Sequence, residues 1–176
     1  MRKSIGFAWA GLWLAVLTGS SIGGENTLQV DMNSAYVWRG ITLNEDPVVQ
    51  PSLEVNVASG LVVSAWANFD LGSYNGAFEE NEFSEVDLGL AYTREVGPVE
   101  LTAGYTEYLY SHQTSETHAL PGTREIYLTV EHELPAELLG GLTLKAGFYY
   151  DIDEVRDFYA SAGLEYERAL IQEKDE

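Results

Sequence analysis

The stretch Tyr36-Val37-Trp38-Arg39-Gly40-Ile41 is the point from which this chain is best understood. Apolar and polar residues alternate on both sides of it, over residues 28–36 and again over residues 49–57. A period of two is typical of a β-strand whose two faces meet different surroundings. The same alternation recurs to about residue 167 and predicts an all-β chain of about eight antiparallel strands. We expect these strands over residues 27–38, 48–58, 60–70, 83–95, 98–110, 123–133, 142–150 and 157–167.

The composition excludes several classes of protein. The chain has 176 residues, which is room for one domain, and it has no cysteine for a disulfide or a thiolate metal site. Nine Lys and Arg residues stand against 28 Asp and Glu residues, with a formal net charge of −19. We expect no nucleic-acid partner, because such a partner requires a basic face. No run of about 18 apolar residues follows the N-terminal segment, so we expect no membrane-spanning helix in the rest of the chain.

The N-terminus has the pattern of an export signal. Arg2 and Lys3 precede an apolar core over residues 5–17, and small residues follow it. We therefore expect a signal peptide over residues 1–24, a β-domain over residues 25–170 and a charged tail over residues 171–176. A retained anchor is the alternative, which the short apolar core disfavours.

Alternation alone does not say which face of the strands points inward. A soluble barrel has apolar residues inside, whereas a barrel of the bacterial outer membrane has them outside. Long loops expected over residues 39–47, 71–82 and 111–122 alternate with tight turns at residues 58–60 and 95–98, and the aromatic residues gather near the long-loop ends. Both features favour an antiparallel up-and-down transmembrane barrel. A soluble β-protein with its polar face in water is the alternative.

The motif at residues 36–41 carries a family resemblance. Together with residues 47–50, Gly60 and Trp66 it resembles the proteobacterial porin family labelled TorF, which shows an aromatic-Arg-Gly-Ile motif followed by Pro, Gln, Gly and Trp. The resemblance is clearest over residues 28–70 and implies an outer-membrane barrel. The charged end of this chain departs from the terminal aromatic strand of such barrels. The barrel either closes at eight strands, with side chains filling it, or belongs to a larger one.

The polar face carries the candidate functional residues. Arg39 lies on this face at the long-loop end, where its guanidinium would be drawn to a carboxylate such as Glu54, Glu85 or Asp87. It would either pin the interior or form a constriction. Lys145 is a lone positive charge on the same face and needs carboxylate partners if it is enclosed. The candidate pore or lumen residues are Arg39, Glu54, Glu85, Asp87, Glu100, Glu125 and Lys145.

Two acidic loops are weak candidates for Ca²⁺, which prefers several oxygen ligands. A solvated acidic loop is the simpler interpretation, because both loops lack the spacing of an EF-hand. The ion would also bridge anionic lipopolysaccharide. The carboxylates are Asp151, Asp153, Glu154 and Asp157 in one loop and Glu79, Glu80 and Glu82 in the other.

One further loop holds Ser111, His112, Glu116 and His118. It lacks the His-Glu-x-x-His arrangement of a zinc site, and it lacks a Gly-x-Ser-x-Gly turn and a third group that would orient a catalytic triad. We therefore expect no metal site, no resident cofactor and no enzyme, although a barrel enzyme acting on lipid would have to use Ser111 and His112.

The sequence as a whole predicts an exported outer-membrane barrel. It would be structural or would conduct small polar solutes, with a preference for cations because acids outnumber bases on the polar face. Its partners would be membrane lipid, lipopolysaccharide and those solutes. The alternative is a soluble periplasmic barrel that binds an apolar ligand.

Overall fold

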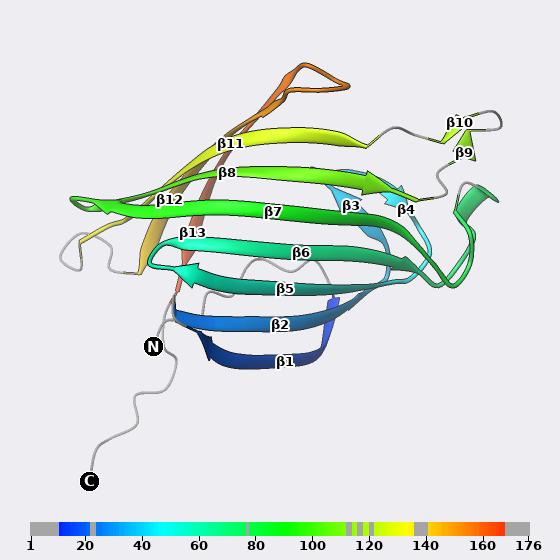
Figure 1. The fold of residues 1–176 in the computed structure, drawn as a ribbon, viewed down its shortest axis with the longest axis horizontal. Coiled ribbons are helices and arrows are strands. Elements are labelled where there is room, and N and C mark those ends of the chain that lie inside the picture. Colours follow the sequence, from blue (N-terminus) through cyan, green and yellow to red (C-terminus); the bar gives the residue numbers. More distant parts are fainter. Residues whose placement is uncertain are drawn as a thin grey trace, which may run out of the picture.

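The computed structural model of the chain contains nine antiparallel strands that pair in the order in which they occur along the chain (Figure 1). It describes residues 11–21, 24–76, 78–111, 114–115, 118–119, 122–135 and 141–167. The strands of this sheet are β1 (Gly11–Ser21), β2 (Gly24–Asn33), β5 (Val48–Ala58), β6 (Leu61–Asp70), β7 (Glu82–Val96), β8 (Val99–Tyr110), β11 (Thr123–Glu133), β12 (Leu142–Asp151) and β13 (Phe158–Tyr166). The predicted antiparallel all-β fold is confirmed, and closure of the sheet into a barrel stays a prediction.

The strand β1 lies within the stretch that the sequence indicates as a signal peptide. It pairs antiparallel with β2 and forms one edge of the sheet, while β13 is the other edge of the described sheet. The signal peptide over residues 1–24 stays a prediction. Its removal would make β2 the edge and would leave eight strands, the number expected from the alternation. Residues 1–10 and the charged tail over residues 171–176 lie outside the described residues.

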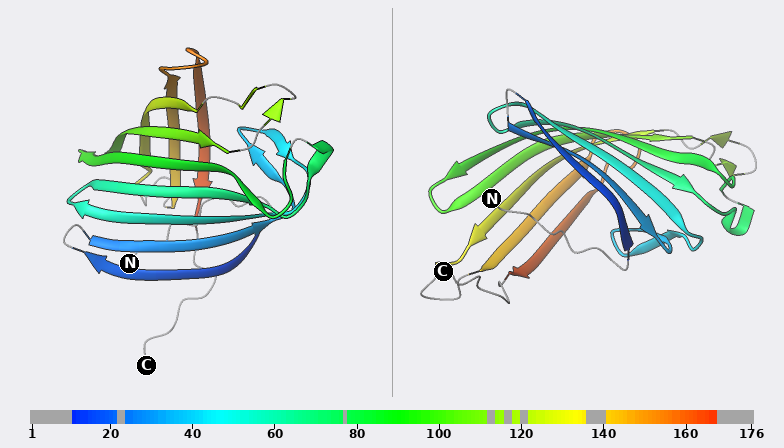
Figure 2. Two further views of the ribbon diagram at one scale, coloured as in Figure 1. Left: turned by 45° about the vertical axis from the view of Figure 1, so that its right-hand side comes forward. Right: turned by 90° about the horizontal axis from the view of Figure 1, so that it is seen from below.

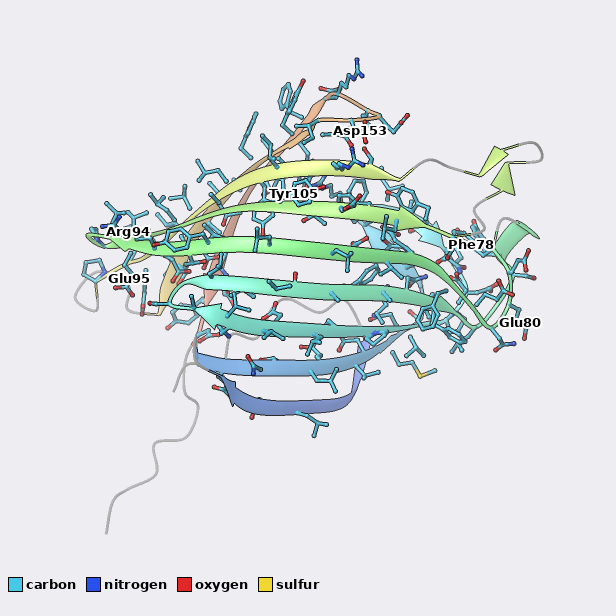
Figure 3. All side chains as sticks on the ribbon, in the orientation of Figure 1. Phe78, Glu80, Arg94, Glu95, Tyr105 and Asp153 are labelled. Carbon is cyan, nitrogen blue, oxygen red and sulfur yellow. The ribbon has the colours of Figure 1, made fainter. Side chains whose placement is uncertain are left out.

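The connections differ between the two ends of the strands. Short turns join β5 to β6 and β7 to β8, with Gly60 at φ 75° and Gly97 at φ 62°. The connections at the other end hold small elements of their own: β3 (Tyr36–Trp38), β4 (Ile41–Asn44), η1 (Tyr74–Gly76), β9 (Thr114–Ser115) and β10 (His118–Ala119). Figure 3 shows the two ends, with Arg94 and Glu95 at one and Phe78 and Glu80 at the other.

The strand predicted over residues 27–38 is wrong in its second half. The strand β2 ends at Asn33, the chain bends, and β3 then pairs with β4 in a separate two-stranded sheet. Arg39 and Gly40 join them with φ values of 49° and 80°. Two successive residues with positive φ are typical of a type I′ turn, whose twist matches that of a hairpin. The motif is therefore a hairpin, which lies on the concave side of the arched sheet (Figure 2).

The two faces of the sheet are reversed relative to a soluble protein. Among the described residues, the buried polar or charged ones are Asn44, Asn68, Asp70, Ser84, Glu85, Thr123, Glu125 and Asp151. Large apolar side chains on alternate positions of the strands are exposed, among them Leu28, Leu53, Val63, Leu88, Leu90, Leu128, Leu144, Phe148 and Leu164. Soluble proteins show the opposite preference. In the part of the chain that the structure describes, no helix is long and apolar enough to cross a membrane.

Candidate functional site

The base of the β3–β4 hairpin is fixed to the sheet by Tyr36 and Asn44. Tyr36 is 4% exposed, and its hydroxyl donates a hydrogen bond of 2.7 Å to Oε2 of Glu85 on β7. Burial, followed by the negative charge of Glu85, raises the pKa of the Tyr36 hydroxyl far above its usual value, so the hydroxyl remains a donor. Asn44 is fully buried and donates through Nδ2 to Oδ1 of Asp70 on β6 at 2.6 Å.

The tip of the hairpin is fixed by Arg39. Its Nη2 lies 2.7 Å from Oε1 and 2.8 Å from Oε2 of Glu125 on β11. Its guanidinium carbon lies 4.3 Å from the ring centroid of Trp38, 4.8 Å from that of Tyr149 and 4.4 Å from that of Tyr159. Both charge-assisted hydrogen bonds and contacts between a cation and an aromatic face are attractive here. We call Glu125, Trp38, Tyr149 and Tyr159, which together surround the guanidinium of Arg39, the cation cage.

Trp38 ends β3 of the hairpin, whereas the other three residues of the cage lie on the neighbouring strands β11, β12 and β13. Tyr127, Tyr149 and Tyr159 occupy matching positions on β11, β12 and β13, with ring centroids 5.6 Å and 5.7 Å apart. The ring of Tyr149 lies over Gly147, where a Cβ atom would come within 2.7 Å of its Cε2. A larger residue at that position would lift the ring from the sheet, so glycine allows the close approach that sets the wall of the cage.

A chain of neutral side chains crosses the sheet beside the hairpin. Asn33 donates to Gln50 at 2.8 Å, Gln50 donates to Asn68 at 2.9 Å, and Asn68 donates to Oγ of Ser84 at 2.9 Å. This chain connects β2, β5, β6 and the start of β7, and it satisfies amides that burial would otherwise penalise. Oδ2 of Asp70 is buried without a hydrogen-bond partner among the described residues.

The carboxylate expected to hold Arg39 was predicted incorrectly. The sequence pointed to Glu54, Glu85 or Asp87, whereas Arg39 reaches Glu125 instead. Glu85 accepts a hydrogen bond from Tyr36 at the hairpin base, and Oδ1 of Asp87 is buried without a partner in the described part of the chain. Glu54 is exposed on β5, opposite residues of β2 and β6. Alternation predicts the face of a residue but not what lies across a curved sheet.

The remaining candidates lie toward the short-turn end. Nζ of Lys145 lies 3.3 Å from Glu131 and 2.5 Å from Glu165, on the two strands that flank β12. Glu100 is exposed, faces Glu131 in the pairing of β8 with β11, and lines a pocket with it. The seven candidates thus fall into two groups, one around the hairpin and one around Lys145, with Glu54 apart from both.

The acidic loop between β12 and β13 is organised by Asp151. Its Oδ2 accepts the hydroxyl of Thr123 at 2.6 Å, and its Oδ1 accepts the backbone N–H groups of Asp153, Val155 and Arg156 at 3.0, 3.0 and 3.2 Å. No group of three or more His, Cys, Asp or Glu side chains is placed to hold a metal ion in the residues that the structure describes. His112 and Glu116 lie outside those residues.

The sequence does not predict the roles of several site residues. Asn44 falls in the loop expected over residues 39–47, and the sequence indicates Tyr149 and Tyr159 only as aromatic residues near the long-loop ends. One signal for the hairpin was present, because Trp38 and Ile41 flank two residues of which the second is glycine, the pattern of a two-residue hairpin turn. Such a turn pairs Trp38 with Ile41 and Val37 with Thr42, as observed, but a register shift before Val37 then places Tyr36 opposite Asn44.

The fold and the site define an antiparallel β-sheet protein with a polar concave face that holds an inward hairpin. The chain belongs to the family described as bacterial protein of unknown function (Gcw_chp), whose model matches residues 18–155. No curated protein and no solved structure matches the chain. The description of the family includes neither the word porin nor the label TorF, so that resemblance stays a prediction.

Proposed function

We propose that the protein is an outer-membrane β-barrel, exported by the segment at residues 1–24, that is structural or conducts small polar solutes. The observation that supports this proposal is the reversed distribution of its side chains. Leu128, in the middle of β11, is 48% exposed, while Glu125 on the same strand is buried. Exposed apolar positions on successive strands mark a surface that contacts something other than water. In a transmembrane barrel lipid covers such a face.

The polar concave face supports a preference for cations. Its charges are mostly carboxylates, and the cations Arg39 and Lys145 are each held by glutamates. Acidic walls attract cations and repel anions, and a low-dielectric wall strengthens this effect. The inward hairpin occupies part of the concave side, so a closed barrel of eight or nine strands would conduct weakly. Exposed acids of the long-loop end, such as Glu79 and Glu80, would meet lipopolysaccharide through bridging divalent ions.

The soluble periplasmic alternative is less well supported. A barrel that binds an apolar ligand needs apolar residues on its inner face. The concave face of this sheet instead carries Glu85, Asn68 and Glu125, all buried, and the apolar residues point away from them.

The test compares arginine at two convex positions. Leu128→Arg places a charge at the middle of a strand, where contact with lipid would destabilise the protein by about 2–4 kcal/mol. Val96→Arg places the same charge beside a short turn, where the free-energy cost is about 0–1 kcal/mol. We expect the first variant alone to lose its outer-membrane location and its different gel mobility with and without heating. Planar bilayers then measure conductance and cation preference. Equal behaviour of both variants, or a wild-type protein in the soluble periplasmic fraction, would contradict the proposal.

A further inference from the structure

We propose that the cation cage is a binding site for guanidinium compounds, and that Arg39 is its tethered occupant, which such a compound can replace. This inference goes beyond the proposed function, because the cage is defined by residues of the concave face whether or not the protein conducts. It concerns Glu125, Trp38, Tyr149 and Tyr159 and the group that fills the space between them.

The cage has the chemistry of a receptor for a planar cation with N–H donors. Three aromatic rings lie 4.3 to 4.8 Å from the guanidinium carbon, and ring faces attract cations. The carboxylate of Glu125 accepts N–H groups through both oxygens. Tyr108 donates to the same carboxylate at 3.2 Å and so holds it in place. A quaternary ammonium ion has no N–H groups, so it would be attracted to the ring faces but could donate no hydrogen bond to the carboxylate of Glu125.

The occupant can leave without opening the rest of the hairpin. Tyr36 and Asn44 hold the base through buried hydrogen bonds that do not involve Arg39. Arg39 itself adopts φ 49°, a conformation that residues other than glycine, asparagine and aspartate rarely adopt. The next two residues, Gly40 and Ile41, are exposed, so the tip is free of packing on that side. Arg39 is therefore a strained residue in the exposed turn beyond the fixed base, and this turn is the part of the hairpin that can move.

The cage is also reachable from solvent. Tyr159 is 37% exposed, and the side chain of Arg39 is 17% exposed. A tethered group competes with free ligand at an effective concentration in the millimolar range or above. Wild-type protein should therefore bind a free guanidinium compound more weakly than a variant in which the cage is empty.

The variant Arg39→Asn empties the cage while keeping the hairpin. Asn-Gly is the preferred sequence of a type I′ turn, so the substitution removes the guanidinium and relieves the backbone at the same time. Lys145→Asn is the matched control, because it removes the other cation of the concave face, near the opposite end of the strands. Far-ultraviolet circular dichroism and heat-modified gel mobility show whether each variant is folded.

The experiment titrates the full-length protein in detergent with methylguanidinium at constant ionic strength, by calorimetry and tryptophan fluorescence. We expect Arg39→Asn to bind it at least about tenfold more tightly than wild type or Lys145→Asn, and about tenfold more tightly than it binds tetramethylammonium. Adding Glu125→Gln should remove most of that gain. A folded Arg39→Asn protein that binds no better than wild type, or that loses nothing with Glu125→Gln, would overturn the site. Neither result bears on membrane location, which the gel and fractionation report separately.

Discussion

Breaking the pair between Arg39 and Glu125 should destabilise the fold, and the burial of the two side chains indicates by roughly how much. Removing one partner of a buried ion pair costs about 3–5 kcal/mol. The Arg39 side chain is 17% exposed and Glu125 keeps a hydrogen bond from Tyr108, so we expect the lower value, about 3 kcal/mol, for Arg39→Ala. Arg39→Asn should cost about 2 kcal/mol, because asparagine relieves the left-handed backbone by about 1 kcal/mol.

A double-mutant cycle separates the pair from its surroundings. Glu125→Gln alone should cost about 2 kcal/mol, since it weakens a hydrogen bond between charged groups. The variant with both Arg39→Asn and Glu125→Gln leaves no unpaired charge, so it should also cost about 2 kcal/mol rather than about 4. The assay is equilibrium unfolding in urea from lipid vesicles, followed by tryptophan fluorescence. Additivity of the two single changes within about 0.5 kcal/mol would refute the argument that these side chains stabilise each other.

Three further changes test other parts of the structure. Tyr36→Phe deprives the buried Glu85 of its hydroxyl donor and should lower the free energy of unfolding by about 1–3 kcal/mol, which the same urea assay measures. Gly60→Ala should lower the melting temperature clearly more than Gly97→Ala. Both glycines have positive φ, but of the two only Gly60 lies where the new Cβ would collide with the backbone of β7. Equal melting temperatures of the two variants would contradict this. Asp151→Asn weakens the acceptor for three loop N–H groups, so limited proteolysis should cut the β12–β13 loop faster, and added Ca²⁺ should not slow the cutting.

Alternation in the sequence predicted eight of the nine strands of the large described sheet, and it predicted which residues of a strand share a face. A side chain such as Leu128 is exposed and its neighbour Tyr127 lies on the concave face because consecutive residues of a strand point to opposite sides. The same rule places Lys145 beside Glu131 and Glu165, since flanking strands bring residues of one face together. These are local properties of an extended chain, so they can be read from the order of the residues.

The hairpin and its contacts could not be predicted in the same way. Residues 34–38 continue the alternation of β2, yet the chain bends after Asn33 and turns Tyr36 inward. The pattern does not contain the curvature of the sheet, so it cannot show that Arg39 faces Glu125 rather than Glu54. That contact depends on where β11 lies relative to the hairpin once all the intervening strands have formed.

The position of Arg39 has a consequence for the order in which the protein assembles. Each strand of the large sheet pairs with its neighbours in the chain, so the sheet can grow by addition of one strand after another. The partner of Arg39, by contrast, is 86 residues away, and the ring of Tyr159 lies on the last strand described. The arginine can therefore be enclosed only after β11, β12 and β13 have joined the sheet. A sheet that lacks these strands would leave the hairpin tip unattached and accessible to a protease. Protection of the tip from proteolysis would therefore report that β11, β12 and β13 have joined the sheet.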